Sequence, residues 1–269
     1  MLKALGFADE EMPTLLVHGW WNIAGAKMSK SLGNIVDPDV LADKYGPEAL
    51  RYYLMSDIAT GRDADFSEER LVQRYNTDLA NSLGNLLNRS LNMAAKYRES
   101  SLGKVPQRFD TIAWEEVKEF PGKPVGKDLI GNVERCLDYY PIMGLFEVHE
   151  GLRVTVGIAT SANLYIEMSK PWKLAKDPTQ AEKLDAVLYT LAESLRIIAI
   201  LIWPVLPDAA HGIFDQLSWK MDEAGKDSRF RLEHAVFGHK DHGLPDGHQL
   251  GKPVPLFPRI EVPPPAVGK

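Results

Sequence analysis

Apolar residues recur at helical spacing over most of the chain between residues 67 and 217. From Ser67 to about Ser100 they fall every three or four positions, which predicts one helix about 50 Å long, bent near Gly84. Further helices are predicted over residues 127–140, 148–166, 181–203 and 208–217, and Pro141, Pro171 and Pro204 are expected to end the first three. These segments predict a mainly α protein whose largest part is a bundle of four to five helices.

The first 34 residues follow a different pattern. Residues 15–23 are apolar, β-branched and aromatic, and such a composition favours a strand. The strand is expected to run into a mobile loop that is flanked by Gly25 and Gly33.

Residues 35–66 predict a small α/β unit. Asp37 is a good N-cap, and Pro38 suits the first position of the short helix that follows it. Pro47 opens a second helix, and residues 61–66 indicate a loop or a short strand. The unit is compact enough to serve as a connector between the strand and the bundle.

Composition narrows the class of protein. The 269 residues are 45% hydrophobic and 25% charged, and no apolar run is long enough to cross a membrane. Cys136 is the single cysteine, which excludes an internal disulfide and a Cys-rich zinc cluster and favours a reducing, cytoplasmic setting. After about Trp219 the chain is rich in Gly, His, Pro and charge. His239 and His242 lie there without further ligands, so no metal site is predicted.

The string KMSKS, residues 27–31, carries the clearest chemistry and is called the lysine loop below. Lys27 and Lys30 are two point charges on long stems, a pair that suits a polyphosphate whose charge changes during reaction at its α-phosphorus. Ser29 and Ser31 add hydroxyl donors to the same phosphates, so the loop is predicted to bind ATP. A solvated loop of ordinary composition is the alternative.

The lysine loop and the LGN that follows it resemble the signature of the class I aminoacyl-tRNA synthetases, and of the methionyl-tRNA synthetases most closely. The matching stretches are HGWWNIAGAKMSKSLGNIVDPDVLADKYGPEALRYYLM, NTDLANSLGNLLNR, ANLYIEMSKPWKLAK and PLFPRIE. The resemblance implies that Lys30 stabilises the transition state of methionyl-adenylate formation and that Lys27 assists. It also implies methionine, ATP with Mg²⁺, and tRNA-Met as substrates and partners.

The resemblance implies four parts along the chain. These are the edge of a Rossmann-type catalytic domain with the lysine loop (1–34), a stem-contact connector (35–66), a helical anticodon-binding domain (67–218) and a C-terminal tail (219–269).

The resemblance also implies three anticodon-reading residues. Asn85 and Arg89 are four positions apart, so both side chains leave one helical face, and Trp172 would be the platform for an unstacked base. Taken alone, Asn85 and Arg89 indicate an ordinary polar helix face, and Trp172 indicates a core aromatic that caps a helix. The presence of all three together with the lysine loop favours contacts to the anticodon.

Local charge supports an RNA partner despite a net charge of −6. Residues 85–108 hold five basic side chains against Glu99 alone, and three lysines flank Trp172 with no acid between them. The basic residues are Arg89, Lys96, Arg98, Lys104 and Arg108 in the first group, and Lys170, Lys173 and Lys176 in the second. The alternative is that both basic groups are ordinary solvated surfaces that bind no RNA.

The ATP-binding histidine signature of class I synthetases, HIGH, is absent from the sequence, as are the family's methionine pocket and zinc-bearing insert. The sequence is therefore interpreted as a C-terminal portion of a methionyl-tRNA synthetase, and the chain alone is predicted to be inactive. A free-standing tRNA-binding helical module and a class I synthetase for another amino acid are the two alternatives.

Overall fold

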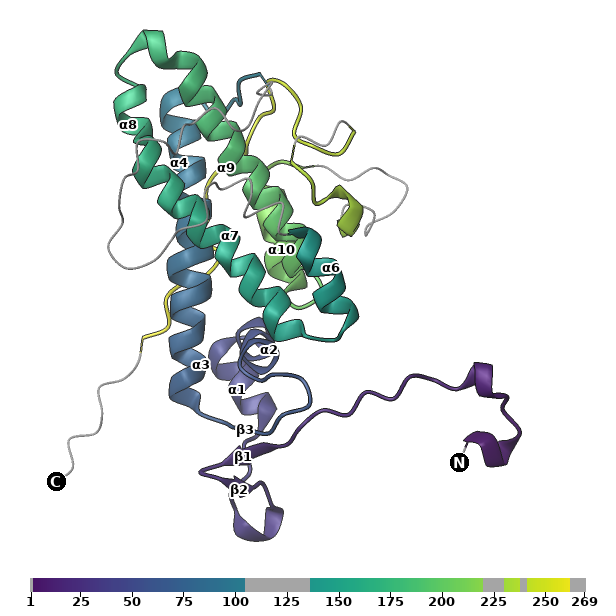
Figure 1. Cartoon of the computed structure of the whole chain (residues 1–269). Helices are drawn as coiled ribbons and strands as arrows, with labels where there is room; N and C mark the ends of the chain where they lie inside the picture. The colour runs from purple at the N-terminus through teal and green to yellow at the C-terminus, as the bar shows by residue number, and fades with distance from the viewer. Residues whose placement is uncertain (1, 105–135, 220–229, 238–240, 262–269) are drawn as a thin grey trace, which may run out of the picture.

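The computed structural model describes residues 2–104, 136–219, 230–237 and 241–261, and most of them are helical (Figure 1). The strands are β1 (Trp21–Ile23), β2 (Ala26–Lys27) and β3 (Ala64–Asp65). The helices are α1 (Pro38–Tyr45), α2 (Pro47–Ser56), α3 (Glu68–Arg74), η4 (Tyr75–Gly84), α4 (Asn85–Arg98), α6 (Cys136–Gly144), α7 (Val148–Ser169), α8 (Pro171–Leu174), α9 (Ala181–Ile202) and α10 (Pro207–Gln216). Short 3₁₀ turns lie at Leu2–Leu5, Asp9–Glu11, Lys30–Leu32, Pro178–Gln180 and Leu232–His234.

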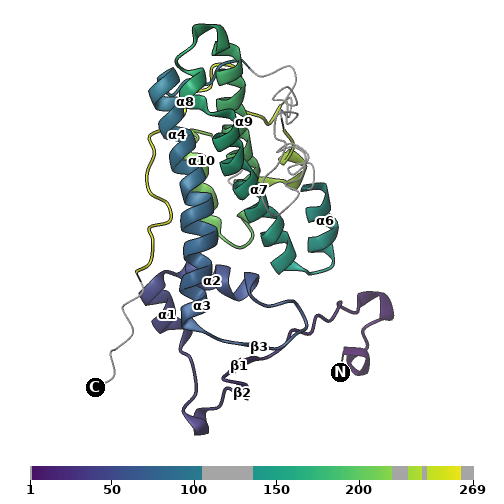
Figure 2. The ribbon, with the colours of Figure 1, turned by 60° about the vertical axis from the view of Figure 1, so that its left-hand side comes forward.

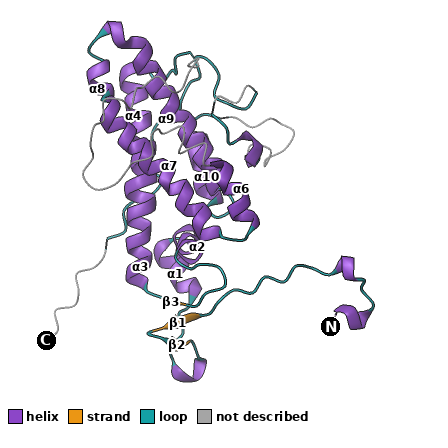
Figure 3. Cartoon of the chain, in the orientation of Figure 1, coloured by secondary structure: helices purple, strands orange, loops and turns teal. Residues whose placement is uncertain are grey.

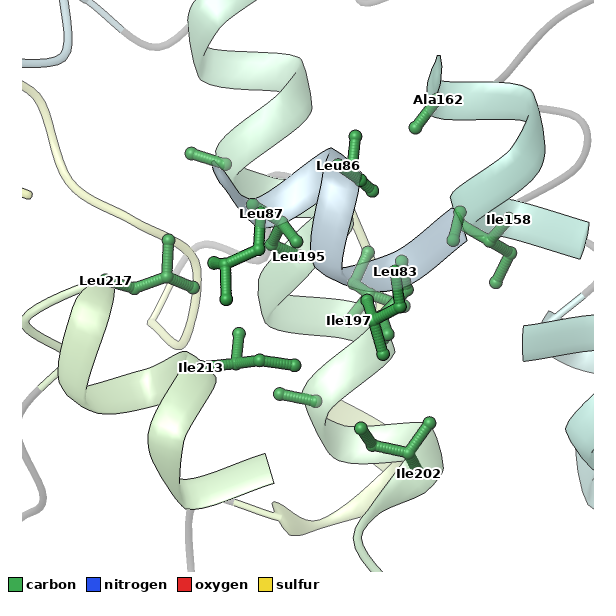
Figure 4. Packing of buried hydrophobic residues seen from close by; sticks show 14 of the residues in the cluster. Leu83, Leu86, Leu87, Ile158, Ala162, Leu195, Ile197, Ile202, Ile213 and Leu217 are labelled. Atoms are coloured by element: carbon green, nitrogen blue, oxygen red, sulfur yellow. The ribbon is translucent and has the colours of Figure 1, made fainter. Parts of the chain in front are cut away.

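The bundle is organised around α9, which packs against α7, α10 and α4. Its last two turns are apolar on every side, and Ile197, Leu201 and Ile202 are at most 2% exposed. Figure 4 shows leucines and isoleucines from η4, α4, α7, α9 and α10 meeting there. A helix that is apolar all round must be covered on every side. The predicted helices over 148–166, 181–203 and 208–217 are thus confirmed.

The long helix predicted from Ser67 exists, but its middle differs from an α-helix. The Ser67 hydroxyl caps it by accepting a hydrogen bond from the Arg70 amide at 3.2 Å. Residues 75–84 form the π-helical segment η4, which joins α3 to α4 and ends at Gly84, where the bend was predicted. The apolar spacing alone does not predict the π-helical hydrogen bonding of this segment.

The two helices and the short strand predicted over residues 35–66 are present. The Asp37 carboxylate accepts the Asp39 amide at 2.9 Å, and Gly46, at φ +88°, separates α1 from α2. The small sheet has the order β2-β1-β3, with β1 antiparallel to β2 and parallel to β3. A second, smaller hydrophobic core packs against Trp21 of this sheet. Its buried members are Leu41, Leu50, Tyr53, Leu71 and Val72.

Two sequence expectations are wrong. Of the strand predicted over residues 15–23, only Trp21–Ile23 is a strand, because the residues before it have no partner strand within the described residues to complete a ladder. Pro141 does not end its helix, since α6 continues to Gly144 and the Pro141 carbonyl accepts the Leu145 amide at 3.0 Å. Residues 127–135 of that prediction lie outside the described residues.

The described part of the tail packs against the bundle and the connector. Its described residues return along the bundle to α3, as the yellow trace in Figure 2 shows. Phe257 packs edge-on against Tyr75, and Ile260 exchanges two backbone hydrogen bonds with the Asn76 side chain, at 2.8 and 2.9 Å. Ile260 also packs against both cores, so the tail ties the bundle to the connector.

Candidate functional site

The lysine loop starts at Lys27, the last residue of the hairpin formed by β1 and β2, and runs into the short 3₁₀ turn Lys30–Leu32. Gly25 and Gly33 have φ angles of +75° and +67°, in the left-handed region that favours glycine. The Asn34 side chain closes the loop, because its oxygen accepts the Ser29 amide at 2.8 Å and its nitrogen donates to the Lys27 carbonyl at 3.2 Å. Sequence reasoning missed Asn34, although it is the last letter of the quoted LGN.

Both lysines of the loop are exposed, but their side chains differ in what they contact. Lys27 Nζ lies 3.9 Å from the ring centroid of Trp20, a cation–π contact. Among the residues that the structure describes, Lys30 Nζ has no hydrogen-bond or ion-pair partner. The Ser29 and Ser31 hydroxyls bond each other at 2.8 Å. Lys30 is therefore the more available of the two charges.

The hairpin is anchored to the segment that precedes α3, and residues 19–34 with residues 62–66 are called the lysine-loop unit below. The carboxylates of Asp63 and Asp65 accept the amides of Trp20 at 2.7 Å and Gly25 at 2.8 Å. A Cβ on Gly19 would lie 1.9 Å from the Arg62 carbonyl oxygen, so the two backbones touch directly. These contacts fix the base of the lysine loop.

Asn85 and Arg89 belong to α4 and Trp172 to α8, and α8 lies beside α4 at the end of the bundle remote from the sheet, whereas Asn85 is the first residue of α4 (Figures 1 and 2). Asn85 is exposed, and Trp172 is 37% exposed on the short helix α8, so it is not a core aromatic. Arg89 donates a hydrogen bond to the Glu167 carboxylate of α7. Glu167 is five residues before Trp172, and this ion pair links the two sides of the site.

The predicted basic patch is weaker than its sequence suggests. Arg89 is paired with Glu167 and Arg98 with Asp185, both acids coming from other helices. Arg108 lies outside the described residues. Lys96, Lys104, Lys170, Lys173 and Lys176 are exposed. Counting charges along one segment missed the acids that folding brings across from α7 and α9.

A polar joint connects the connector to the bundle. The Glu48 carboxylate of α2 accepts the first amides of α10, from Asp208 at 2.7 Å and Ala209 at 3.0 Å. One turn later, the Arg51 guanidinium donates to the Val205 carbonyl at 2.8 Å, near the end of α9. An anion at a helix start and a cation at a helix end are both favoured by the helix dipole. Burial nevertheless raises the pKa of Glu48.

Within the described part of the chain, no group of three or more His, Cys, Asp and Glu side chains is placed to hold a metal ion. His239 lies outside the described residues, and the His242 ring stacks on His234. No helix among the described residues is long and apolar enough to span a membrane.

Comparison with known proteins identifies the class. The family model for class I tRNA synthetases (M) matches residues 1–91, which include the lysine loop, the connector and the start of α4. The chain therefore carries a class I tRNA synthetase segment next to a helical bundle.

Relatives and solved structures that match most of this chain are methionine–tRNA ligases. A methionine–tRNA ligase of Caldanaerobacter subterraneus subsp. tengcongensis is 38% identical over 263 residues, 97% of this chain and 37% of the relative. A methionine–tRNA ligase of Rickettsia felis is 36% identical over 92% of this chain and 44% of the relative. The apo methionyl-tRNA synthetase of Mycobacterium tuberculosis superposes with a TM-score of 0.71 at 30% identity, over 91% of this chain and 43% of that one. The same enzyme in complex with methionyl-adenylate gives 0.71 at 34% identity, over 90% of this chain and 43% of that one.

The chain is thus similar, over nine tenths or more of its length, to part of the methionyl-tRNA synthetases. It spans less than half of the length of these relatives.

Proposed function

We propose that this chain is the part of a methionine–tRNA ligase that supplies the lysine loop and the recognition of the anticodon. The observation that carries the proposal is the coexistence, on one chain, of a lysine loop whose two lysines are exposed and of a group on α4 and α8 that consists of exposed Asn85 and Trp172 with the partly buried Arg89. A ligase that joins an amino acid to a tRNA needs both a phosphate-binding element and an RNA-reading element.

The lysine loop would act on ATP. In adenylate formation a carboxylate oxygen of methionine attacks the α-phosphorus, the bond to the bridging oxygen breaks, and diphosphate leaves. Negative charge grows on the leaving diphosphate. Lys30, whose ammonium has no partner among the described residues, would neutralise it, and Lys27 would join by leaving the Trp20 ring. The two glycines let the loop move as the nucleotide enters and leaves.

The bundle would read the anticodon of tRNA-Met. Asn85 offers amide donors and an acceptor, Arg89 a guanidinium fork, and Trp172 an exposed ring on which an unstacked base can lie. RNA that takes up Arg89 must compete with Glu167 for the guanidinium. The Glu167 carboxylate therefore raises the threshold for binding, so that a poorly matched loop gains little from Arg89.

The arm before β1 supports a partnership with the rest of a synthetase. Leu15, Val17 and Trp20 are 85%, 70% and 59% exposed, which is unusual for three large apolar side chains in one short segment. A surface of this kind fits packing against a catalytic portion that holds methionine and the remainder of the ATP site. The aminoacylation of tRNA by this chain is proposed only together with such a portion.

The test separates the two elements. The chain alone is expected to show no ATP–diphosphate exchange, and addition of a catalytic portion from a homologous ligase is expected to restore it. In the restored enzyme, Lys30→Ala should depress adenylate formation while the affinity for tRNA is unchanged, and Lys252→Ala, an exposed lysine of the tail, is the matched control. Exchange by the chain alone, or equal loss of exchange and tRNA affinity in Lys30→Ala, would contradict the assignment.

Anticodon reading can be tested on the chain by itself, with an anticodon stem-loop RNA that carries CAU. Trp172→Ala should weaken binding by about 1–3 kcal/mol, the usual value of a stacked base, and leave the fold intact. A preference for a different anticodon would overturn the assignment to methionine. The alternative is a tRNA-binding module without chemistry, and the extensive buried core that the bundle shares with α2 and the tail supports it. It predicts tight stem-loop binding and no restored exchange.

A further inference from the structure

One exposed face of the long helix formed by η4 and α4 carries four asparagines in a row. Asn81, Asn85, Asn88 and Asn92 are separated by four, three and four positions, and all four are exposed. Such offsets place side chains on one helical face. This row is called the asparagine stripe below. From Asn81 to Asn92 the sequence has one charged residue, Arg89, whose guanidinium is paired with Glu167, so the stripe itself is a surface of neutral amides.

Both flanks of the stripe are occupied. On one side, the Ser82 hydroxyl meets Thr160 at 3.2 Å and the Ser82 carbonyl accepts the Asn163 amide at 2.9 Å, so α7 covers that flank. On the other side, the tail lies against Gly84, where an added Cβ would be 3.5 Å from Phe257. The stripe is therefore the open strip between α7 and the tail.

Some side-chain amides of the stripe have hydrogen-bond donors and acceptors that no described residue uses. Asn92 donates to the carbonyl and to the side-chain oxygen of Asn88, each at 2.7 Å, which orients the Asn88 side chain. Among the described residues, the side chains of Asn81 and Asn85 have no hydrogen-bond partner. Asparagine is a poor helix former, because its amide competes for backbone hydrogen bonds. Four of them on one exposed face are therefore not explained by helix stability.

We propose that the asparagine stripe is a track for the anticodon loop, in which Asn81 and Asn92 bind nucleotides that flank the anticodon triplet. An amide has both donors and an acceptor and so matches the edges of unpaired bases and the ribose 2′-hydroxyl. A neutral surface of this kind suits bases and sugars rather than phosphates.

The length of the stripe fits this occupant. From Asn81 to Asn92 it extends about 16 Å along the helix axis, whereas Asn85 and Arg89 are separated by only about 6 Å. Stacked nucleotides are about 3.4 Å apart along a strand, so the stripe matches about five of them, two more than a triplet. The inference rests on the proposed function, since it assumes that Asn85 and Arg89 contact the triplet.

The test compares two variants of the stripe with a chemically matched control. Asn81→Ala and Asn92→Ala, singly and combined, are titrated with a stem-loop that carries CAU, and Gln73→Ala is the control, an exposed amide on α3 outside the stripe. The combined variant is expected to bind about ten-fold more weakly, as expected for two hydrogen bonds of ordinary net strength. Its Tm should stay the same or rise, because alanine is the better helix former. Gln73→Ala should leave the affinity unchanged.

A second RNA, with CAU intact and abasic residues at the flanking loop positions, locates the contact. The loss in the combined variant is expected to vanish with this RNA, while Asn85→Ala still weakens binding to it. If the combined variant binds the intact loop as the parent does while Asn85→Ala does not, the track is wrong and the proposed function stands. An equal loss with both RNAs, or a fall in Tm that accompanies the loss, also overturns the track. If the parent chain binds neither RNA, the proposed function is wrong and the track with it.

Discussion

Seventeen residues of α9 between Leu184 and Ile202 are buried, whereas no side chain from Lys3 to Val40 is buried. The bundle is held by apolar packing around α9. The lysine-loop unit is held by hydrogen bonds to Asp63 and Asp65, by the Gly19 contact, and by the ring of Trp21 packed on Tyr53 and Phe66. Apolar packing therefore stabilises the bundle, whereas hydrogen bonds and a few ring contacts stabilise the lysine-loop unit.

This difference fits the two tasks proposed for them. Side chains that read an RNA must keep fixed distances from one another, and a packed core gives that rigidity. A loop that closes over a nucleotide must reopen, and a loop with few buried contacts can do so at small cost. The joint formed by Glu48 and Arg51 holds α2 of the connector against the end of α9 and the start of α10.

The largest effect is expected in the core of the bundle. Arg196 is 1% exposed, pairs with Glu193 at 2.9 Å, and donates to the carbonyls of His234 and Val236 in the tail. Arg196→Ala leaves the Glu193 carboxylate buried without its cation, so it should destabilise the fold by about 3–5 kcal/mol in urea unfolding.

The matched control for Arg196→Ala is Arg153→Ala. Arg153 is 72% exposed and also pairs with a glutamate three residues before it, Glu150 of α7. Because exposed pairs of this kind contribute little, the cost should be below about 0.5 kcal/mol. Similar losses in the two variants would show that burial of the ion pair is unimportant.

A smaller and local effect is expected at the base of the lysine loop. Gly19→Ala would place a Cβ 1.9 Å from the Arg62 oxygen, so the backbones must separate. Overpacking of this kind costs about 1–3 kcal/mol. Hydrogen exchange of residues 19–34 and of the Ala64 and Phe66 amides should accelerate, while exchange within α9 stays unchanged.

Gly157→Ala is the control for that variant, because an added Cβ on Gly157 of α7 meets nothing within 4 Å. It should stabilise the bundle by about 0.5–1 kcal/mol and leave the lysine loop as it is. If Gly19→Ala slowed or accelerated exchange throughout the bundle, the two parts would be one cooperative unit and the comparison would fail.

The joint is expected to show an intermediate to small effect. Glu48→Ala removes the acceptor for the first amides of α10, whose own N-cap residue, Leu206, cannot supply one. The expected loss is about 1 kcal/mol in thermal or urea unfolding, the usual value of a helix cap. Glu48→Gln keeps an acceptor and should lose less. No difference between the two variants would mean that the carboxylate does not act as a cap.

The smallest effect concerns pH at the connector. Hydrogen bonds from Lys44 Nζ and the Tyr45 hydroxyl, each 2.5 Å, lower the pKa of Glu68, and the bond from Lys44 contributes most. Because the folded pKa lies below the unfolded value, the pair stabilises the connector above about pH 4.3 and is lost as the pH falls through the folded pKa. An NMR titration of the Glu68 carboxyl should show this low midpoint, and Lys44→Met should move it upward. An unchanged midpoint in Lys44→Met would count against the pair.

Local sequence signals account for most of the elements. Asp37 and Ser67 start their helices with the side-chain caps that their identity predicts, and the apolar spacing locates α7, α9 and α10. The lysine loop was likewise recognisable from five letters. These features depend on residues that are near one another in the chain, so a sequence contains the information directly.

Contacts between distant segments were decided by the fold alone. The sequence did not show that Glu167 pairs with Arg89, that Asp65 holds Gly25, or that Phe257 lies on Gly84. It also overstated the strand at 15–23, because a strand requires a partner and apolar composition does not provide one.

The sequence by itself determined the helical bundle, the connector, and the identity of the lysine loop and its proposed anticodon readers. Only the tertiary structure decided which of those charges are paired, which asparagines form an open row, and how the tail ties the two cores together. The physical reason is that helix spacing and caps are set within a few residues, whereas ion pairs and packing depend on how whole elements approach one another.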